Sequence, residues 1–242
     1  TNSKYYIFFC RKCKTSCVSF TEVCLKSEQQ EYPVCGDIMN ILAIGAHPDD
    51  IEFGCGGTLL KYSEKGHKVY ILVMSKGGKG GDLEVRQKEQ ENSARILGVE
   101  KLYFGDYKDT EIVQSQKLIA EIEGFLKEIK PGFIFVNYFD DTHQDHRNLA
   151  VSTISATRYI QNVLFYEGPT TQNFTPNVFV DITGTLDTKY NCLNAHVSQV
   201  SRTNIEGLSI IEAAKSAAHF RGIQGRVNYA EAFNSLRLFI NT

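Results

Sequence analysis

Two short segments of the chain concentrate side chains that bind metal ions and transfer protons. The first is Ala46-His47-Pro48-Asp49-Asp50, and the second runs from Asn137 to His146. Two imidazoles and one carboxylate can hold a zinc ion while its fourth position stays open for water. The sequence therefore predicts a metal centre suited to hydrolysis.

The spacing within these segments allows roles to be assigned. His47 and Asp50 lie three residues apart across a turn in which Pro48 fixes φ, so both side chains can face one ion. We expect His146, from the second segment, to be the third ligand. Asp49 then stays free beside the metal, where a carboxylate can take a proton from water and later return it to a leaving group.

The second segment holds two further candidates. As an imidazolium, His143 could stabilise the oxyanion of a tetrahedral intermediate. Asp145 could orient His143 and hold its charge. Taken singly, each segment also has a structural interpretation, since Asp-Asp pairs cap helices and loop histidines are often solvated. The metal centre is favoured because the two segments follow equivalent strand ends.

The elements that position these segments are read from apolar runs and helical periodicity. We expect strands at 41–44, 69–74, 102–104, 133–136, 163–165 and 178–182. We expect helices at 54–66, 83–97, 112–129, 146–160, 185–199 and 205–220, and the tail from Tyr229 is ambiguous. Repeated strand–helix units predict an α/β fold with a mostly parallel sheet and helices on both faces. Function in such sheets lies beyond the carboxyl ends of the strands.

The N-terminal segment, residues 1–38, differs from the rest because it holds five of the seven cysteines and lacks periodicity. We interpret it as an extension of doubtful structure, with the main domain at 39–242 and Met39 as its natural start. The alternative is a zinc knuckle at Cys10 and Cys13, which have C-x-x-C spacing. A second pair with such spacing is missing, and the odd number of cysteines does not indicate a disulfide framework.

Composition limits the classes of partner. The 242 residues include 26 Lys+Arg and 28 Asp+Glu, for a net charge of −2, which predicts no nucleic-acid partner. No apolar run reaches the ~18 residues of a membrane span, so we expect a cytoplasmic protein without a membrane partner. Gly54, Gly56 and Gly57 suggest a dinucleotide loop as a competing interpretation, but their spacing does not fit G-x-G-x-x-G.

The residues quoted above resemble the LmbE-like/PIG-L family of zinc-dependent N-deacetylases. The resemblance covers about Met39 to Phe239. It begins with AHPDDIEFGCGGT at 46–58 and continues with HQDH at 143–146, HVSQ at 196–199, RG at 221–222 and YAEAF at 229–233. It implies a Rossmann-like three-layer α/β sandwich and an activity that removes acetyl groups from N-acetylglucosamine-type substrates. An assembly of identical subunits is implied as well.

Carried over position by position, the resemblance implies zinc ligands at His47, Asp50 and His146. It implies Asp49 as general base and then acid. It further implies His143 as the oxyanion stabiliser, oriented by Asp145.

Two further positions are candidates for substrate binding. Arg86 lies where the family often has an arginine, and its alternative is a solvated helix residue paired with Glu89 or Gln90. Asp109 matches, after a shift of one residue, a loop aspartate that can accept hydrogen bonds from sugar hydroxyls. The alternative for Asp109 is a turn residue. His196 is expected on a helix near the site or at a subunit interface.

The sequence thus predicts zinc-dependent hydrolysis of the acetamide of an N-acetylated amino sugar, with one zinc ion per chain. Two histidines and one carboxylate also accept Fe2+ or Co2+. One alternative is a zinc amidase that acts on a non-sugar amide or a thiol conjugate. Another is a Rossmann-like sugar- or nucleotide-binding protein without turnover.

Overall fold

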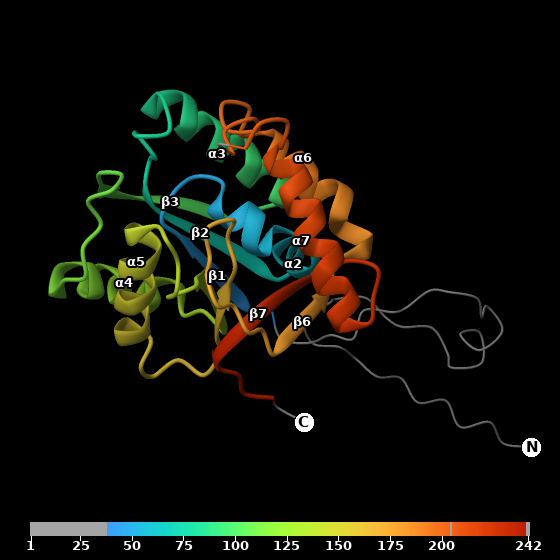
Figure 1. Ribbon diagram of the computed structural model, residues 1–242. Helices are drawn as coiled ribbons and strands as arrows, with labels where there is room; N and C mark the ends of the chain where they lie inside the picture. The colour runs from blue at the N-terminus through green and yellow to red at the C-terminus, as the bar shows by residue number, and fades with distance from the viewer. Residues whose placement is uncertain (1–37, 204, 241–242) are drawn as a thin grey trace, which may run out of the picture. The chain divides into compact units, whose positions relative to one another are not determined.

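One mixed sheet forms the centre of the protein. The computed structural model describes residues 38–203 and 205–240 (Figure 1). The strands lie in the order β3-β2-β1-β4-β5-β7-β6. The first five strands of the chain pair in parallel, and β7 runs antiparallel to both β5 and β6. Their bounds are β1 Asn40–Gly45, β2 Lys68–Ser75, β3 Lys101–Tyr107, β4 Phe133–Asn137, β5 Val163–Tyr166, β6 Val178–Asp181 and β7 Ala230–Arg237.

Helices cover both faces of this sheet. Leu42 and Ile44 of β1 pack in one core with side chains of α4 (Gln116–Ile129) and α5 (Gln144–Ala156). Ile41 and Ala43 point to the opposite core, which contains side chains of α2, α3 and α6. This alternation follows from the two-residue period of a strand and confirms the expected three-layer α/β sandwich (Figure 1). The remaining helices are α2 Asp50–Glu64, α3 Leu83–Leu97, α6 Leu186–Asn194, α7 Ile210–Gly225 and the short 3₁₀ helix η1 Thr183–Thr185.

Several helix ends differ from the sequence prediction. The helix expected from residue 112 begins at 116, because the Ser115 side chain caps it by accepting a hydrogen bond from Leu118 N–H. Ile112 lies before the helix, and its N–H donates to the Asp145 carboxylate. The helix expected from 205 begins at 210, where Ser209 and Glu212 form a capping box. The ambiguous tail is strand β7.

Helix α2 begins four residues earlier than expected, at Asp50. Its first half contains three glycines, namely Gly54, Gly56 and Gly57. The predicted start at Gly54 missed the first turn, which follows the N-cap Asp49 and carries the acidic residues Asp50 and Glu52. Tertiary packing explains Gly54 and Gly57, since a Cβ at Gly54 would lie 2.5 Å from Tyr166 Cγ and one at Gly57 would lie 2.9 Å from Ile182 Cγ2. A Cβ at Gly56 would make only an ordinary contact, 3.7 Å from Lys189 Cγ. Gly54 and Gly57 let α2 lie close to the sheet beneath the first candidate segment.

Replacing Gly54 with Ala is expected to destabilise the protein by roughly 1–3 kcal/mol, because the added methyl group overlaps the buried Tyr166 ring. Urea unfolding followed by circular dichroism measures this change. Gly124→Ala in α4 is the matched control, since a Cβ there meets nothing within 4 Å. It should stabilise the protein by about 0.5–1 kcal/mol through helix propensity alone. Equal effects of the two substitutions would contradict the packing argument.

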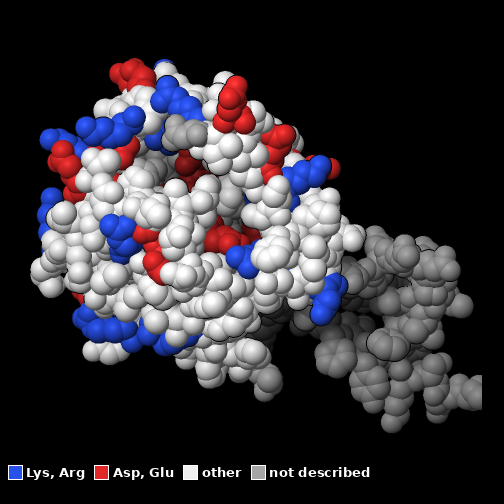
Figure 2. Space-filling view, viewed as in Figure 1, with Lys and Arg blue, Asp and Glu red and all other residues white. Residues whose placement is uncertain are grey.

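Other sequence expectations concern the surface and the N-terminus. On the face shown in Figure 2, basic and acidic side chains are interspersed, without a large patch of one sign. Among the residues described, no helix is both long enough and apolar enough to cross a membrane. Cys55 and Cys192 are buried free thiols. The proposed zinc knuckle at Cys10 and Cys13, and the predicted N-terminal extension apart from Ile38, lie outside the described residues.

Candidate active site

The sheet order brings the two chemistry-bearing segments together. β1 pairs directly with β4, with Ile44 opposite Val136, so the carboxyl ends of these strands are neighbours. The first segment leaves β1 and enters α2, and the second leaves β4 and enters α5. His47 and His146 thereby meet, with ring centroids 5.4 Å apart.

Asp50 lies between these two imidazoles. Its Oδ2 is 3.6 Å from His47 Nδ1 and 3.3 Å from His146 Nε2. Backbone N–H groups of Ala46 and His47 donate to the same oxygen, and so does Asn137 Nδ2. These donors fix the carboxylate at the N-terminus of α2. The structure thus places the three predicted ligands in mutual contact through Asp50.

In each imidazole, the ring nitrogen that points away from Asp50 faces another carboxylate. His47 Nε2 is 3.0 Å from Asp145 Oδ2 and 3.2 Å from Asp109 Oδ1. His146 Nδ1 is 3.2 Å from Asp141 Oδ2. When one ring nitrogen of a histidine faces a carboxylate, the other ring nitrogen is oriented to bind a metal ion. His47 Nδ1 and His146 Nε2 are therefore the nitrogens available for coordination.

The charges of the cluster favour a bound cation. Burial alone lowers the pKa of His47, but the nearby Asp109, Asp145 and Asp50 outweigh it and hold that pKa well above its usual value. Burial likewise lowers the pKa of His146, and Asp50 and Asp141 raise it to about 9. Both ring nitrogens of His146 are buried, and neither has a hydrogen-bond partner of good geometry within the described part of the chain. The donor set of imidazole nitrogens and a carboxylate fits zinc.

A group made only of histidines is also close enough to hold a metal ion. His47, His143 and His146 each offer one ligand atom within 4.8 Å of the others, and so do His47, Asp109, His143 and Asp145. Asp50 is in neither group, although its Oδ2 contacts both imidazoles. The geometry therefore leaves two candidates, Asp50 and His143, for the third ligand beside His47 and His146.

Asp49 has an unusual backbone conformation. It is the N-cap of α2 with φ 90° and ψ −24°, in the left-handed region that non-glycine residues rarely adopt. Such strain is typical of functional positions held by their surroundings. Burial raises the pKa of the Asp49 carboxyl to about 6, and the neighbouring Arg86 guanidinium opposes the rise. At neutral pH the carboxylate is mostly ionised and can accept a proton.

Arg86 holds this strained turn. Its Nη2 donates to Pro48 O at 2.8 Å and to Asp49 Oδ2 at 3.2 Å, and its Nη1 donates to Gly77 O at 2.8 Å. The side chain is buried. A solvated arginine paired along its own helix is therefore wrong. Among the described residues it contacts Asp49 and two backbone carbonyls, and its predicted contact with substrate stays a prediction.

A buried polar network lies beneath Asp49. Glu52 accepts hydrogen bonds from Gln90 Nε2 and Ser93 Oγ, both at 2.7 Å, and Gln90 Oε1 accepts one from Asp49 N–H. His196 Nε2 is 3.6 Å from Glu52 Oε1. His196 lies near the site as expected, but it follows α6 instead of belonging to a helix. The network connects α2 with α3 and with the segment after α6.

His143 and Asp145 are arranged differently from the prediction. His143 is the N-cap of α5, and its Nδ1 accepts a hydrogen bond from Asp145 N–H. An Nδ1 in this acceptor role is unprotonated, which favours a neutral imidazole with its proton on Nε2 over the predicted imidazolium. Burial lowers its pKa, and His47 and His146 lower it further. The Asp145 carboxylate contacts His47 and accepts N–H bonds from Thr110 and Ile112, so its link to His143 runs through its backbone.

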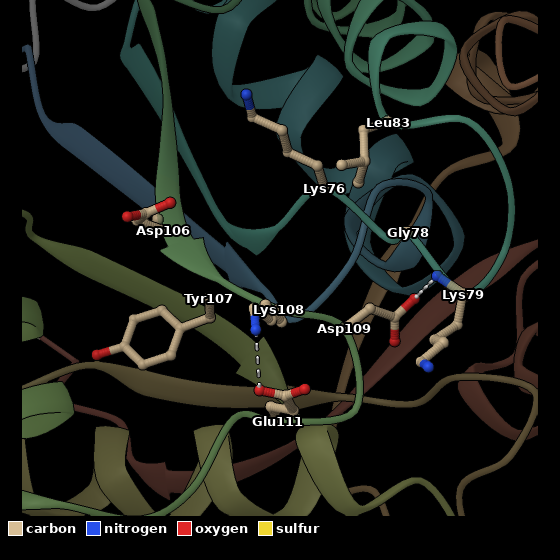
Figure 3. A pocket seen from close by; sticks show the side chains of 10 residues that line it. Lys76, Gly78, Lys79, Leu83, Asp106, Tyr107, Lys108, Asp109 and Glu111 are labelled. Carbon is tan, nitrogen blue, oxygen red and sulfur yellow. Dashed lines mark hydrogen bonds and ion pairs between the residues drawn. The ribbon is translucent and has the colours of Figure 1, made fainter.

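A cavity of about 410 Å³ lies at the carboxyl ends of β2 and β3. Asp109 lines this cavity and also reaches the histidines, since its Oδ1 is 3.2 Å from His47 Nε2. Its Oδ2 accepts a hydrogen bond from Lys79 N–H (Figure 3). Lys108 and Glu111 form an ion pair at 3.9 Å across the lower part of the view. The lining residues are Lys76, Gly78, Lys79, Leu83, Gly105, Asp106, Tyr107, Lys108, Asp109 and Glu111.

Sequence reasoning missed three residues that shape the site. Asn137 is the last residue of β4. Its Oδ1 accepts a hydrogen bond from Ala46 N–H, and its Nδ2 donates one to Asp50. The buried Tyr166 hydroxyl donates to Ile44 O at 2.9 Å and lies 3.1 Å from Asn137 Oδ1. Asp141 faces His146. Only one signal was available, namely that Asn137 and Asp141 are polar residues at the carboxyl end of a buried strand.

Comparisons with known proteins identify the family of the chain. Residues 42–157 match the PIG-L family, described as GlcNAc-PI de-N-acetylase. Uncharacterized deacetylase YaiS of Escherichia coli is 35% identical over 150 residues, which cover 59% of this chain and 81% of that protein. Diacetylchitobiose deacetylase of Thermococcus kodakarensis is 30% identical over 196 residues, which cover 67% of this chain and 71% of that protein.

A solved structure extends the likeness to the fold. N,N'-diacetylchitobiose deacetylase from Pyrococcus horikoshii, complexed with its inhibitor MPG, superposes with a TM-score of 0.73 at 28% identity. The superposition covers 83% of this chain and 84% of that one. The family match includes both candidate segments, as the residue pattern predicts. The chain therefore belongs to the PIG-L (LmbE-like) family of deacetylases.

Proposed function

We propose that this deacetylase hydrolyses the acetamide of an N-acetylated amino sugar, releasing acetate and the free amine, and that it uses zinc. The observation that carries the proposal is the contact of Asp50 with both His47 and His146, with the ionisable Asp49 next to it. Relatives named for the deacetylation of diacetylchitobiose support an amino-sugar substrate.

His47, Asp50 and His146 would hold the metal ion. Asp50 is preferred to His143 as the third ligand because its carboxylate contacts both imidazoles and is fixed by two backbone N–H groups. When bound, a zinc ion would supply Lewis-acid activation of water and of the acetamide carbonyl.

The protein's own groups supply the proton transfers. Asp49 takes a proton from the attacking water and later delivers it to the departing amine nitrogen. The Arg86 contact keeps the Asp49 carboxylate in place for both transfers. The His143 Nε2–H donates to the carbonyl oxygen as negative charge develops there. A neutral imidazole can do this, so protonation of His143 is not required.

The cavity beside Asp109 would receive the sugar. Its volume of about 410 Å³ lies within the range of small-molecule sites. Asp109 stands between the cavity and His47, so its carboxylate is placed to accept a hydrogen bond from a sugar hydroxyl.

Acetate release from a panel of amides tests this function. The panel contains N-acetylglucosamine, N,N'-diacetylchitobiose, an N-acetylated amino acid and an N-acetylated thiol conjugate. Turnover of the first two supports the proposal. Turnover of only the last two would move the enzyme to the non-sugar amidase alternative. Sugar binding without acetate release would favour a binding protein.

Replacing His143 with Ala is expected to lower kcat by about 10²–10³-fold, as loss of one oxyanion donor does in other hydrolases. The zinc content of the purified variant should stay at the wild-type level, because His143 is not one of the proposed ligands. Atomic absorption measures that content, with Asp50→Asn as the comparison variant expected to lose zinc. Zinc lost from His143→Ala and retained by Asp50→Asn would instead assign His143 as the third ligand.

A further inference from the structure

The orientation of His146 depends on one buried carboxylate that has no role in the proposed reaction. The Asp141 side chain is 1% exposed, and its Oδ2 lies 3.2 Å from His146 Nδ1. On the other side of the ring, Nε2 lies 3.3 Å from Asp50 Oδ2. The imidazole is thus held between two carboxylates, of which only Asp50 is a proposed metal ligand.

Both oxygens of Asp141 are held by further donors. Oδ1 accepts hydrogen bonds from His143 N–H at 2.8 Å and from the Thr170 hydroxyl at 2.7 Å. Oδ2 accepts one from the Thr171 hydroxyl at 3.0 Å, leaving a direction free for the imidazole. A carboxylate with this many donors is fixed in position.

The two threonines belong to the connection between β5 and β6, far from Asp141 in the sequence. This connection pairs with the segment after β4, since Asp141 and Thr171 form a β-bridge and Thr142 N–H donates to Thr170 O at 3.1 Å. The hydroxyls are therefore placed by backbone pairing, independently of α5.

We infer that Asp141 is a positioning residue. Fixed by the Thr170 and Thr171 hydroxyls, it holds His146 in the orientation that binds the metal ion and so raises the metal affinity of the site. The inference rests on the metal site of the proposed function. The Asp141 carboxylate lies 3.2 Å from Nδ1 and so favours a proton there, which is the tautomer whose Nε2 lone pair faces Asp50. An asparagine amide in this position can donate to Nδ1, which places the proton on Nε2 and blocks coordination.

The test is zinc affinity of the full chain, measured by competition with a chromophoric chelator. Asp141→Asn should weaken zinc binding by about 10–100-fold, as loss of such partners does at other metal sites. Asp140→Asn is the matched control, because it removes the same charge one residue away, and among the described residues its side chain accepts a hydrogen bond only from Asn173 Nδ2. The control should keep the wild-type affinity. The visible spectrum of bound Co2+ should change in Asp141→Asn alone.

Thr171→Val gives a second variant that keeps the shape of the side chain and the Asp141 carboxylate. It should weaken zinc binding to a smaller degree than Asp141→Asn, and it decides the question if Asp141→Asn does not fold. Equal affinities of the wild type and of every folded variant would overturn the inference and leave the proposed function standing. A wild-type protein that binds no zinc would instead overturn the metal site of the proposed function.

Discussion

Replacing Asp49 with Asn is expected to lower kcat by about 10²–10⁴-fold, the usual contribution of a general acid–base group. An amide cannot take the proton from water, so both proton transfers are lost. Zinc content should remain at the wild-type level, because the Asp49 carboxylate faces Arg86 and belongs to no proposed ligand set. Steady-state acetate release together with metal analysis measures the two quantities on the same preparation.

Asparagine is the suitable substitution because of the backbone at this position. Asp49 has a φ of 90°, and asparagine tolerates the left-handed region better than most residues. The variant therefore changes the chemistry with little added strain. Asp187→Asn, an exposed aspartate in the first turn of α6, is the control for loss of one negative charge and should keep full activity. Full activity of Asp49→Asn would show that the general base is another group.

Removal of the metal ion with a chelator is expected to abolish acetate release, and added zinc should restore it. The purified protein should contain about one zinc per chain, since the site offers a single set of two imidazoles and a carboxylate. The buried carboxylates around His47 and His146 attract positive charge, which in the absence of metal is supplied by protons. Chelation thus leaves the site folded but without its Lewis acid.

The same charges predict how zinc affinity depends on pH. His47 and His146 must be unprotonated at their coordinating nitrogens, so protons compete with zinc and its affinity should fall as the pH falls. Titrations at several pH values with a competing chelator measure this slope. Activity that remains after complete removal of metal would contradict the metal-dependent mechanism. Restoration by Fe2+ or Co2+ in preference to zinc would keep the site and change its ion.

The class of fold and the two segments that carry chemistry could be predicted from the amino-acid sequence. Strands β1, β2 and β4 are buried on both faces, so they appear as unbroken apolar runs that need no partner to be recognised. The helix at Leu83–Leu97 was predicted with its observed bounds, because Gly98 ends it in the left-handed conformation. The two segments that follow β1 and β4 carry side chains that often bind metal ions, and their place after equivalent strand ends favoured a metal centre over helix caps and solvated loops.

The contacts between these side chains depend on the tertiary fold. The neighbouring positions of β1 and β4 bring Asp50 to His146, and the fold turns Asp145 toward His47 and Arg86 toward Asp49. The hydroxyls that donate to Asp141 belong to the connection between β5 and β6, about 30 residues later in the chain. Periodicity reports the face that a side chain occupies within its own element. The partner that it meets there depends on strand order and on packing across the whole domain, which local spacing does not encode.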